Sequence, residues 1–181
     1  MKIVIDGCIG SGKTTQLNIL ANIGFNVHYL RPLPVHLIDG PRSDRERWGL
    51  TFQLYILQSF CKCQSNTIYE GCPLSSKDIY WKSMKRNEIE EQVYKDYYDL
   101  QGWSPDLYIL LDTPAGGMYH TFFEQLTCPK YKIDATQSIR KVNQIIIGHL
   151  VQHGCILEHL VNEHVSLDIL KSCNNLLGPI A

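Results

Sequence analysis

The stretch that decides the fold is Lys2-Ile-Val-Ile-Asp-Gly-Cys-Ile-Gly-Ser-Gly-Lys-Thr14. Its residues 2–6 form a short apolar run, which is typical of a strand buried on both faces. Residues 7–14 fit the pattern G-x-x-x-x-G-K-S/T and lead into a helix. Glycines in such a loop allow successive backbone N–H groups to turn toward one point. The stretch therefore predicts a cradle for phosphate groups, called the phosphate loop (residues 7–14) below.

The pattern assigns a chemical role to two side chains. We expect Lys13 to reach the β- and γ-phosphates of a nucleoside triphosphate, and the Thr14 hydroxyl to hold Mg²⁺. The predicted ATP-binding residues are Gly7, Cys8, Ile9, Gly10, Ser11, Gly12, Lys13, Thr14 and Thr15. ATP with Mg²⁺ is therefore the expected cofactor. GTPases, ATPases and small-molecule kinases share this loop, but the chain has no Asn-Lys-x-Asp guanine motif and is short for a motor ATPase. A small-molecule kinase is favoured.

The composition limits what the chain binds. It has 181 residues, 44% of them hydrophobic and 19% charged, which suits one domain with a buried core. The net charge is -1, whereas a binder of nucleic acid or of a membrane surface needs a basic stripe. The longest apolar runs are far below the about 20 residues of a transmembrane helix, and no secretory signal is expected. We predict a cytoplasmic protein without a nucleic-acid or membrane partner, in the host cytoplasm if a virus encodes it.

Apolar runs and amphipathic stretches alternate along the chain. The predicted strands are residues 2–6, 25–30, 67–69, 106–112 and 131–133. The predicted helices are residues 13–21, 45–64, 76–98, 118–126 and 138–150. Ile79, Ile89, Val93 and Tyr97 are the expected inner face of the third helix. Strands separated by helices imply right-handed crossovers. The predicted fold class is α/β, with a five-stranded parallel sheet and helices on both faces.

The end of the chain is predicted to be an extension of the same domain. We expect the main domain over residues 1–150 and a helical extension over residues 151–181. Within the extension, residues 156–177 contain enough Leu, Val and Ile for one more amphipathic helix. We expect that helix to pack on the main domain, and a partner-binding helix is the alternative.

Two further motifs resemble the deoxynucleoside kinases, the family of thymidine, deoxycytidine and deoxyguanosine kinases. The stretch from Arg47 to Phe60 is similar to the family's helix that carries a Trp and a Phe-Gln pair. The stretch Tyr69-Glu-Gly-Cys-Pro-Leu-Ser-Ser-Lys-Asp-Ile-Tyr80 is similar to its strand-end Glu-Arg-Ser, followed by Ser and an aromatic. The resemblance covers most of residues 1–150 and implies a P-loop kinase fold.

The resemblance also implies a substrate site and a catalytic site. Gln53 would read the nucleobase through its amide, which offers both a donor and an acceptor. The implied substrate-binding residues are Trp48, Gln53, Ile56, Phe60 and Tyr80, with Tyr80 stacking on the base. Glu70 would lie near the phosphates and the metal. The implied catalytic residues are thus Lys13 and Glu70, and the implied metal ligands are Thr14 and Glu70.

The sequence departs from the family at several positions, so we interpret it as a divergent member. Arg31-Pro32 stands where the family has Glu-Pro, whose glutamate is the general base for the 5′-hydroxyl. Arginine cannot accept a proton at neutral pH. Gly71 replaces the arginine of Glu-Arg-Ser, and Arg42 falls at the position of the tyrosine that holds the sugar hydroxyl. The lid arginines are missing, since residues 113–129 contain no arginine. Asp39 and Asp44 are candidate replacement bases.

These features leave three hypotheses for function. The first is a deoxynucleoside kinase that transfers the γ-phosphate of ATP to the 5′-hydroxyl of a deoxynucleoside, for nucleotide salvage. The second is a catalytically impaired, kinase-like protein that binds ATP and nucleoside. The third is a nucleoside monophosphate kinase of the thymidylate type, although the Asp-Arg that follows the third strand in those enzymes is missing here. A homodimer formed through the helix at residues 45–64 stays open.

Overall fold

Five parallel strands form the centre of the molecule. The structure, a computed structural model, describes residues 1–30, 45–61 and 64–155. The strands are β1 (Lys2–Asp6), β2 (Val27–His28), β3 (Thr67–Glu70), β4 (Leu107–Asp112) and β5 (Lys130–Asp134). They lie in the order β2-β3-β1-β4-β5, and all four pairings are parallel. The predicted α/β fold with a five-stranded parallel sheet is confirmed.

The strand order brings three carboxyl ends to one edge of the sheet. Ile5 pairs with Glu70, and Asp6 pairs with Leu110. The last residue of β1 therefore lies between the ends of β3 and β4. Ligands of open parallel sheets bind at this edge, where the loops that follow the strands converge.

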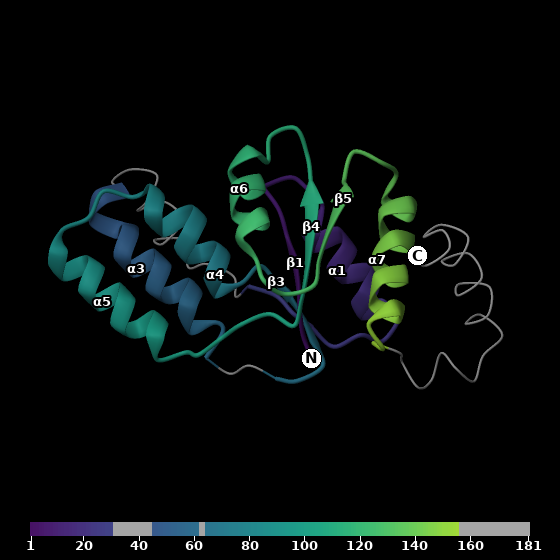
Figure 1. Ribbon diagram of the computed structural model, residues 1–181, viewed down its shortest axis with the longest axis horizontal. Helices are drawn as coiled ribbons and strands as arrows, with labels where there is room; N and C mark the ends of the chain where they lie inside the picture. The colour runs from purple at the N-terminus through teal and green to yellow at the C-terminus, as the bar shows by residue number, and fades with distance from the viewer. Residues whose placement is uncertain (31–44, 62–63, 156–181) are drawn as a thin grey trace.

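Helices cover both faces of the sheet, as the sequence predicts. Helix α1 (Lys13–Asn22) and helix α7 (Ile139–Gln152) lie side by side on one face, and α6 (Gly117–Gln125) lies on the other (Figure 1). Alternate residues of β1 serve the two faces: Ile3 and Ile5 join the core beneath α1 and α7, whereas Val4 joins the aromatic core beneath α6. Burial of these apolar side chains is the main stabilising term.

A group of helices extends to one side of the sheet (Figure 1). It consists of α3 (Arg45–Gln58), α4 (Pro73–Ser75), the π-helix η1 (Ser76–Tyr80), the 3₁₀-helix η2 (Trp81–Ser83) and α5 (Glu88–Asp99). Its core contains Leu57, Trp81 and Tyr94, and the last two rings stack with their centroids 4.2 Å apart. None of the helices in the described ranges is long and apolar enough to span a membrane.

The predicted single helix over residues 76–98 is wrong. The helical winding ends with η2 at Ser83, and α5 begins at Glu88. The side chain of its N-cap residue, Asn87, accepts a hydrogen bond from the N–H of Glu90 in a capping box. The break shifts the helical register. Ile89 and Val93 are therefore 75% and 42% exposed, and Tyr94 is the buried residue instead.

Smaller differences concern the ends of the elements. Strand β2 has only two residues, and α3 ends at Gln58 rather than at residue 64. Helix α7 runs through residue 150 to Gln152, so the predicted domain boundary falls inside a helix. The predicted helix over residues 156–177 lies outside the described residues, as do Arg31, Asp39, Arg42 and Asp44.

Candidate active site

The phosphate loop follows β1 directly and has the backbone that its glycines permit. Gly7, Gly10 and Gly12 have φ angles of 147°, 85° and 87°. A Cβ on Gly7 would lie 2.5 Å from the backbone oxygen of Leu111 and 2.8 Å from Oγ of Ser11, so no larger residue fits against β4. The loop is therefore wedged against the neighbouring strand, and it leads straight into the first turn of α1.

Lys13, Thr14 and Glu70 come together at the mouth of this loop. The Lys13 ammonium donates to the backbone oxygens of Gly7 at 2.7 Å and Cys8 at 2.8 Å. Thr14 Oγ1 donates to Glu70 Oε1 at 2.9 Å, although 56 residues separate them in sequence. A hydroxyl beside a carboxylate fits Mg²⁺, which takes few protein oxygens and completes its shell with phosphate oxygens and water.

A cavity of about 210 Å³ lies at this edge of the sheet and is called the strand-end cavity below. Of the residues singled out in the sequence, Ile9, Lys13, Gln53, Ile56, Phe60, Glu70 and Tyr80 line it. Asp6, Leu30, Phe52, Gly71, Cys72, Ser75, Ser76 and Tyr119 also line it. Trp48 is half-buried on α3 and is not among the described lining residues. The cavity thus joins the phosphate loop to the face of α3 that carries Gln53.

The remaining residues of the loop surround its mouth. Cys8 is half-buried, with Sγ 2.9 Å from Oγ1 of Thr113 in the turn after β4. Ser11 is buried, whereas Gly10 and Thr15 are exposed. The loop therefore has one buried side, at Gly7 and Ser11, and one exposed side, at Ile9, Gly10 and Thr14.

Gln53 is the most enclosed polar group of the cavity. It is 1% exposed, and its Oε1 accepts a hydrogen bond of 2.5 Å from Oγ of Ser76, which is 4% exposed. Buried amides are held by such partners because an unpaired one is costly. Ser76 belongs to the motif of residues 69–80, but its role could not be predicted from the sequence. Its contact with Gln53 depends on the packing of η1 on α3.

Two further cavity residues were missed from the sequence. Tyr119 of α6 and Tyr80 of η1 share a hydrogen bond of 2.8 Å between their hydroxyls, so the expected stacking residue is tied to α6. Asp6 is the end of the first predicted strand and had no predicted role in the site. In the structure it is 3% exposed and lines the strand-end cavity. Burial raises the pKa of its carboxyl above the ordinary value.

The deoxynucleoside kinase family model matches residues 3–122 of this chain. The chain belongs to the deoxynucleoside kinase family. The kinase is 24% identical over 183 residues to the "Putative kinase protein 143R" of Invertebrate iridescent virus 6, which covers 96% of this chain and 78% of that relative. It is 30% identical over 112 residues to the "Probable deoxycytidine kinase FPV151" of Fowlpox virus (strain NVSL), covering 53% of this chain and 47% of that relative.

Solved structures share the fold of the kinase. The deoxyadenosine kinase from M. mycoides with bound dCTP has a TM-score of 0.65 at 19% identity, covering 84% of this chain and 100% of that one. The same enzyme with the products dCMP and a flexible dCDP has a TM-score of 0.67 at 20% identity, with coverage of 84% and 99%. The resemblance stated from the motifs is confirmed. A phosphotransferase of this family is favoured over the binding protein and the monophosphate kinase.

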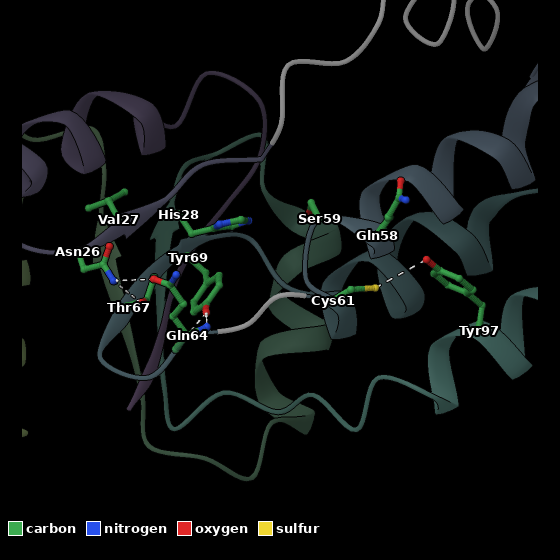
Figure 2. A pocket seen from close by; sticks show the side chains of 10 residues that line it. All are labelled: Asn26, Val27, His28, Gln58, Ser59, Cys61, Gln64, Thr67, Tyr69 and Tyr97. Atoms are coloured by element: carbon green, nitrogen blue, oxygen red, sulfur yellow. Dashed lines mark hydrogen bonds between the residues drawn. The ribbon is translucent and has the colours of Figure 1, made fainter.

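The kinase has a second, larger cavity beside β2, which we call the edge cavity (Figure 2). Its volume is about 490 Å³, and no charged side chain is among its described lining residues. It is lined by Asn26, Val27, His28, Gln58, Ser59, Cys61, Gln64, Thr67, Tyr69 and Tyr97. The Tyr69 hydroxyl accepts from the backbone N–H of Gln64 at 2.8 Å and donates to its carbonyl at 2.9 Å. None of the predicted site residues lines this cavity.

Proposed function

We propose that this kinase transfers the γ-phosphate of ATP to the 5′-hydroxyl of a deoxynucleoside bound in the strand-end cavity. One observation carries the proposal: a single cavity joins Lys13 and Glu70 to the buried amide of Gln53. The first two suit the phosphates and their metal, and the third suits the edge of a base. A donor nucleotide above the phosphate loop and a nucleoside in the cavity would then meet over Lys13.

The phosphate end acts by positioning and by charge. Phosphoryl transfer has little covalent chemistry for a protein to perform, so catalysis depends on alignment and on neutralising developing charge. The loop amides would bind the β-phosphate, and Lys13 would exchange its contacts with Gly7 and Cys8 for phosphate oxygens. Thr14 and Glu70 would hold Mg²⁺, which would supply positive charge to neutralise the phosphates. The 5′-oxygen would bond to the γ-phosphorus as the bond to the β,γ-bridging oxygen breaks. ADP would carry away the electron pair of that bond, and the hydroxyl proton would pass to solvent.

The base end acts by hydrogen bonding and apolar contact. Because Ser76 donates to Oε1 of Gln53, the amide plane is fixed, and the amide would present a donor and an acceptor to a base edge. Ile56 and Phe60 supply apolar wall, and Tyr80 supplies a ring that α6 holds in place through Tyr119. Deoxycytidine and deoxyadenosine are the first substrates to test, because they are named in the relatives.

The test is phosphate transfer from labelled Mg²⁺-ATP to each of the four deoxynucleosides. We expect transfer to at least one of them and none in Lys13→Ala, with deoxynucleoside monophosphate as product. Absence of transfer from a folded protein that binds ATP would overturn the proposal in favour of the binding protein. The cytoplasmic location and the homodimer stay predictions, and sedimentation of the purified chain tests the latter.

A further inference from the structure

The two ends of the strand-end cavity are joined by a buried series of polar groups, which we call the polar chain. It runs from the hydroxyl of Tyr80 through Tyr119 and Asp6 to Gly7, and from there to Lys13. We infer that the polar chain couples the two substrates, so that a bound nucleoside strengthens nucleotide binding at the phosphate loop and the reverse. This inference rests on the proposed function. Tyr119 and Asp6 are then positioning residues, which act on the substrates through other groups.

The base end of the polar chain is the pair of hydroxyls on Tyr80 and Tyr119. Their oxygens are 2.8 Å apart, and the two rings meet edge to face with centroids 6.5 Å apart. Both residues line the strand-end cavity, but Tyr119 is only 2% exposed whereas Tyr80 is half-buried. A base that packs against the ring of Tyr80 therefore also fixes its hydroxyl, and through it the hydroxyl of Tyr119.

The middle of the polar chain is the carboxyl of Asp6, at the end of β1. It is 3% exposed, and the hydroxyls of Ser75, Tyr108 and Tyr119 all interact with it. An ionised carboxylate only accepts hydrogen bonds, so Tyr119 donates to it and takes its own hydrogen bond from Tyr80. Hydrogen bonds that follow one another in this way polarise and strengthen each other. Asp6 needs no contact with a substrate, because its effect passes through the groups that it holds.

The phosphate end of the polar chain is the backbone of Gly7. Its N–H donates to Oδ1 of Asp6 at 2.8 Å, and its carbonyl accepts from the Lys13 ammonium at 2.7 Å. A Cβ at Gly7 would lie 2.5 Å from the backbone oxygen of Leu111, so the loop is packed tightly against β4 at this point. Lys13 exchanges its contact with Gly7 for phosphate oxygens when a nucleotide binds. The hydrogen bonding of Gly7 then changes on one side while Asp6 holds it on the other.

The polar chain connects elements that are distant in sequence. Tyr80 belongs to η1, Tyr119 belongs to α6, and Gly7 follows β1. Coupling between two sites is a difference in binding free energy, and it is reciprocal. Because the two ends share buried groups whose hydrogen bonds support one another, ordering one end lowers the cost of ordering the other. The contacts supply a physical route, and a binding cycle measures the coupling itself.

The first experiment titrates the β,γ-imido analogue of ATP, with Mg²⁺, in a calorimeter, with and without a saturating amount of the deoxynucleoside that the wild type phosphorylates. We expect the wild type to bind the analogue at least about fivefold more tightly when the nucleoside is present. Tyr119→Phe removes the middle hydroxyl and keeps the ring, so this coupling factor should fall below about twofold. Tyr80→Phe should do the same. The double variant Y80F/Y119F should lose nothing further, because the two hydroxyls act as one unit.

Tyr108→Phe is the matched control. Tyr108 is fully buried on β4 and its hydroxyl also interacts with Asp6, but it is not among the described lining residues of the cavity. Y108F therefore removes a hydroxyl from the same carboxyl without interrupting the polar chain. Its coupling factor should stay within about twofold of wild type. A loss of coupling in Y108F as large as in Y119F would overturn the inference, because any change around Asp6 would then have the same effect.

The second experiment follows the backbone amide of Gly7 by NMR in ¹⁵N-labelled protein. The shift of an amide proton depends on its hydrogen bond, which at Gly7 is the one to Asp6. We expect the Gly7 resonance to move when the deoxynucleoside is added without nucleotide, in the wild type and in Y108F but not in Y119F or Y80F. A Gly7 resonance that stays in place in the wild type would contradict the inference, as would one that still moves in Y119F.

The proposed function and this inference fail in different ways. A wild type that transfers phosphate to no deoxynucleoside overturns both. A wild type that transfers phosphate but binds the two ligands independently overturns only the coupling. If Y119F does not fold, Y80F interrupts the polar chain at its other end, and a wild-type coupling factor in folded Y80F counts against the inference.

Discussion

The two cavities of this kinase differ in size and in chemistry, and the smaller one has the charged lining. The edge cavity is the larger, about 490 Å³ against about 210 Å³, but its described lining is neutral. The strand-end cavity contains an ammonium, two carboxyls and a buried amide. These four groups come from β1, α1, β3 and α3, elements that are separate in sequence and that the fold brings together. Volume alone favours the edge cavity as a binding site, whereas the placement of charged groups favours the strand-end cavity.

The difference also concerns how polar groups are satisfied. In the edge cavity, the Asn26 amide donates to the side chains of Thr67 and Gln64 (Figure 2). The Tyr69 hydroxyl bonds the backbone N–H and carbonyl of Gln64. These polar groups of the lining therefore bond to one another. In the strand-end cavity, the charged groups of Lys13 and Glu70 bond only neutral partners and form no ion pair with any described residue. We interpret the first arrangement as structural and the second as prepared for a ligand. Four predictions test this contrast.

Lys13→Ala should have the largest effect. The variant removes the only ammonium among the described lining residues of the strand-end cavity, the group that we propose stabilises the transferring phosphoryl group. We expect kcat to fall at least about 10²–10³-fold and ATP binding to be lost, as measured by labelled phosphate transfer and by titration calorimetry. The control is Lys95→Ala, an exposed lysine on α5, which should retain wild-type activity. ATP affinity untouched by K13A would contradict the assignment of the phosphate loop.

Gln53→Leu and Gln58→Leu compare the two cavities on one helix. Both glutamines belong to α3, but Gln53 lines the strand-end cavity and Gln58 lines the edge cavity. We expect Q53L to weaken nucleoside binding by about 1–3 kcal/mol because a base edge is left unpaired, with ATP binding unchanged. Q58L should leave both affinities unchanged, as judged by calorimetric titration. Equal losses in the two variants would remove the distinction between the cavities.

Tyr69→Phe should affect stability and not activity. It removes the hydroxyl that bonds both the N–H and the carbonyl of Gln64 in the edge cavity, while the ring keeps its edge contact with Trp103. We expect the free energy of unfolding to fall by about 1–3 kcal/mol, measured by urea denaturation, with kcat and KM within twofold of wild type. A large loss of activity in a folded variant would assign the edge cavity to function.

Asp6→Asn should have the smallest effect on stability, and the effect should depend on pH. Burial raises the native pKa of Asp6 above the ordinary value of 3.8, so the native state binds the proton more tightly than the unfolded state does. Wild-type stability therefore falls as the pH rises from about 4 through the native pKa. D6N lacks this loss and should melt at a higher temperature at pH 7, by about 2–4 °C for each kcal/mol. The difference should vanish near pH 4. A lower melting temperature for D6N at pH 7 would contradict the cost assigned to this carboxyl.

The sheet could be predicted from the sequence because its central strands are continuous apolar runs. Residues 2–6 and 107–112 are buried on both faces, so nothing in their pattern competes with a strand. The predicted helix over residues 76–98 is wrong because similar apolar spacing continues across a break in the helical winding. The pair Asn87 and Glu90 has the spacing of a capping box, which is the sequence signal for the start of a new helix.

The part of the candidate site that is contiguous in sequence could be predicted. The part that the fold brings together from distant elements could not. The phosphate loop is one local motif, and the resemblance supplied Gln53 and Glu70. Asp6, Ser76 and Tyr119 gave no comparable signal, because each gains its place only through a contact with a distant element. The replacement of the family's arginine by Gly71 was visible in the sequence. Only the structure shows that the carboxyl of Asp6 is its neighbour.

One wall of the strand-end cavity is a π-helix, η1, and this has a consequence for how the pocket can change over evolution. A π-turn holds one residue more than an α-turn, and both ends of η1, Ser76 and Tyr80, line the cavity. Deleting a single residue here would restore α-helical winding and rotate the following side chains by about 100°. Tyr80 would leave the pocket and another residue would enter it. The shape of the strand-end cavity can thus be altered by a one-residue insertion or deletion, without any substitution among the residues that line it.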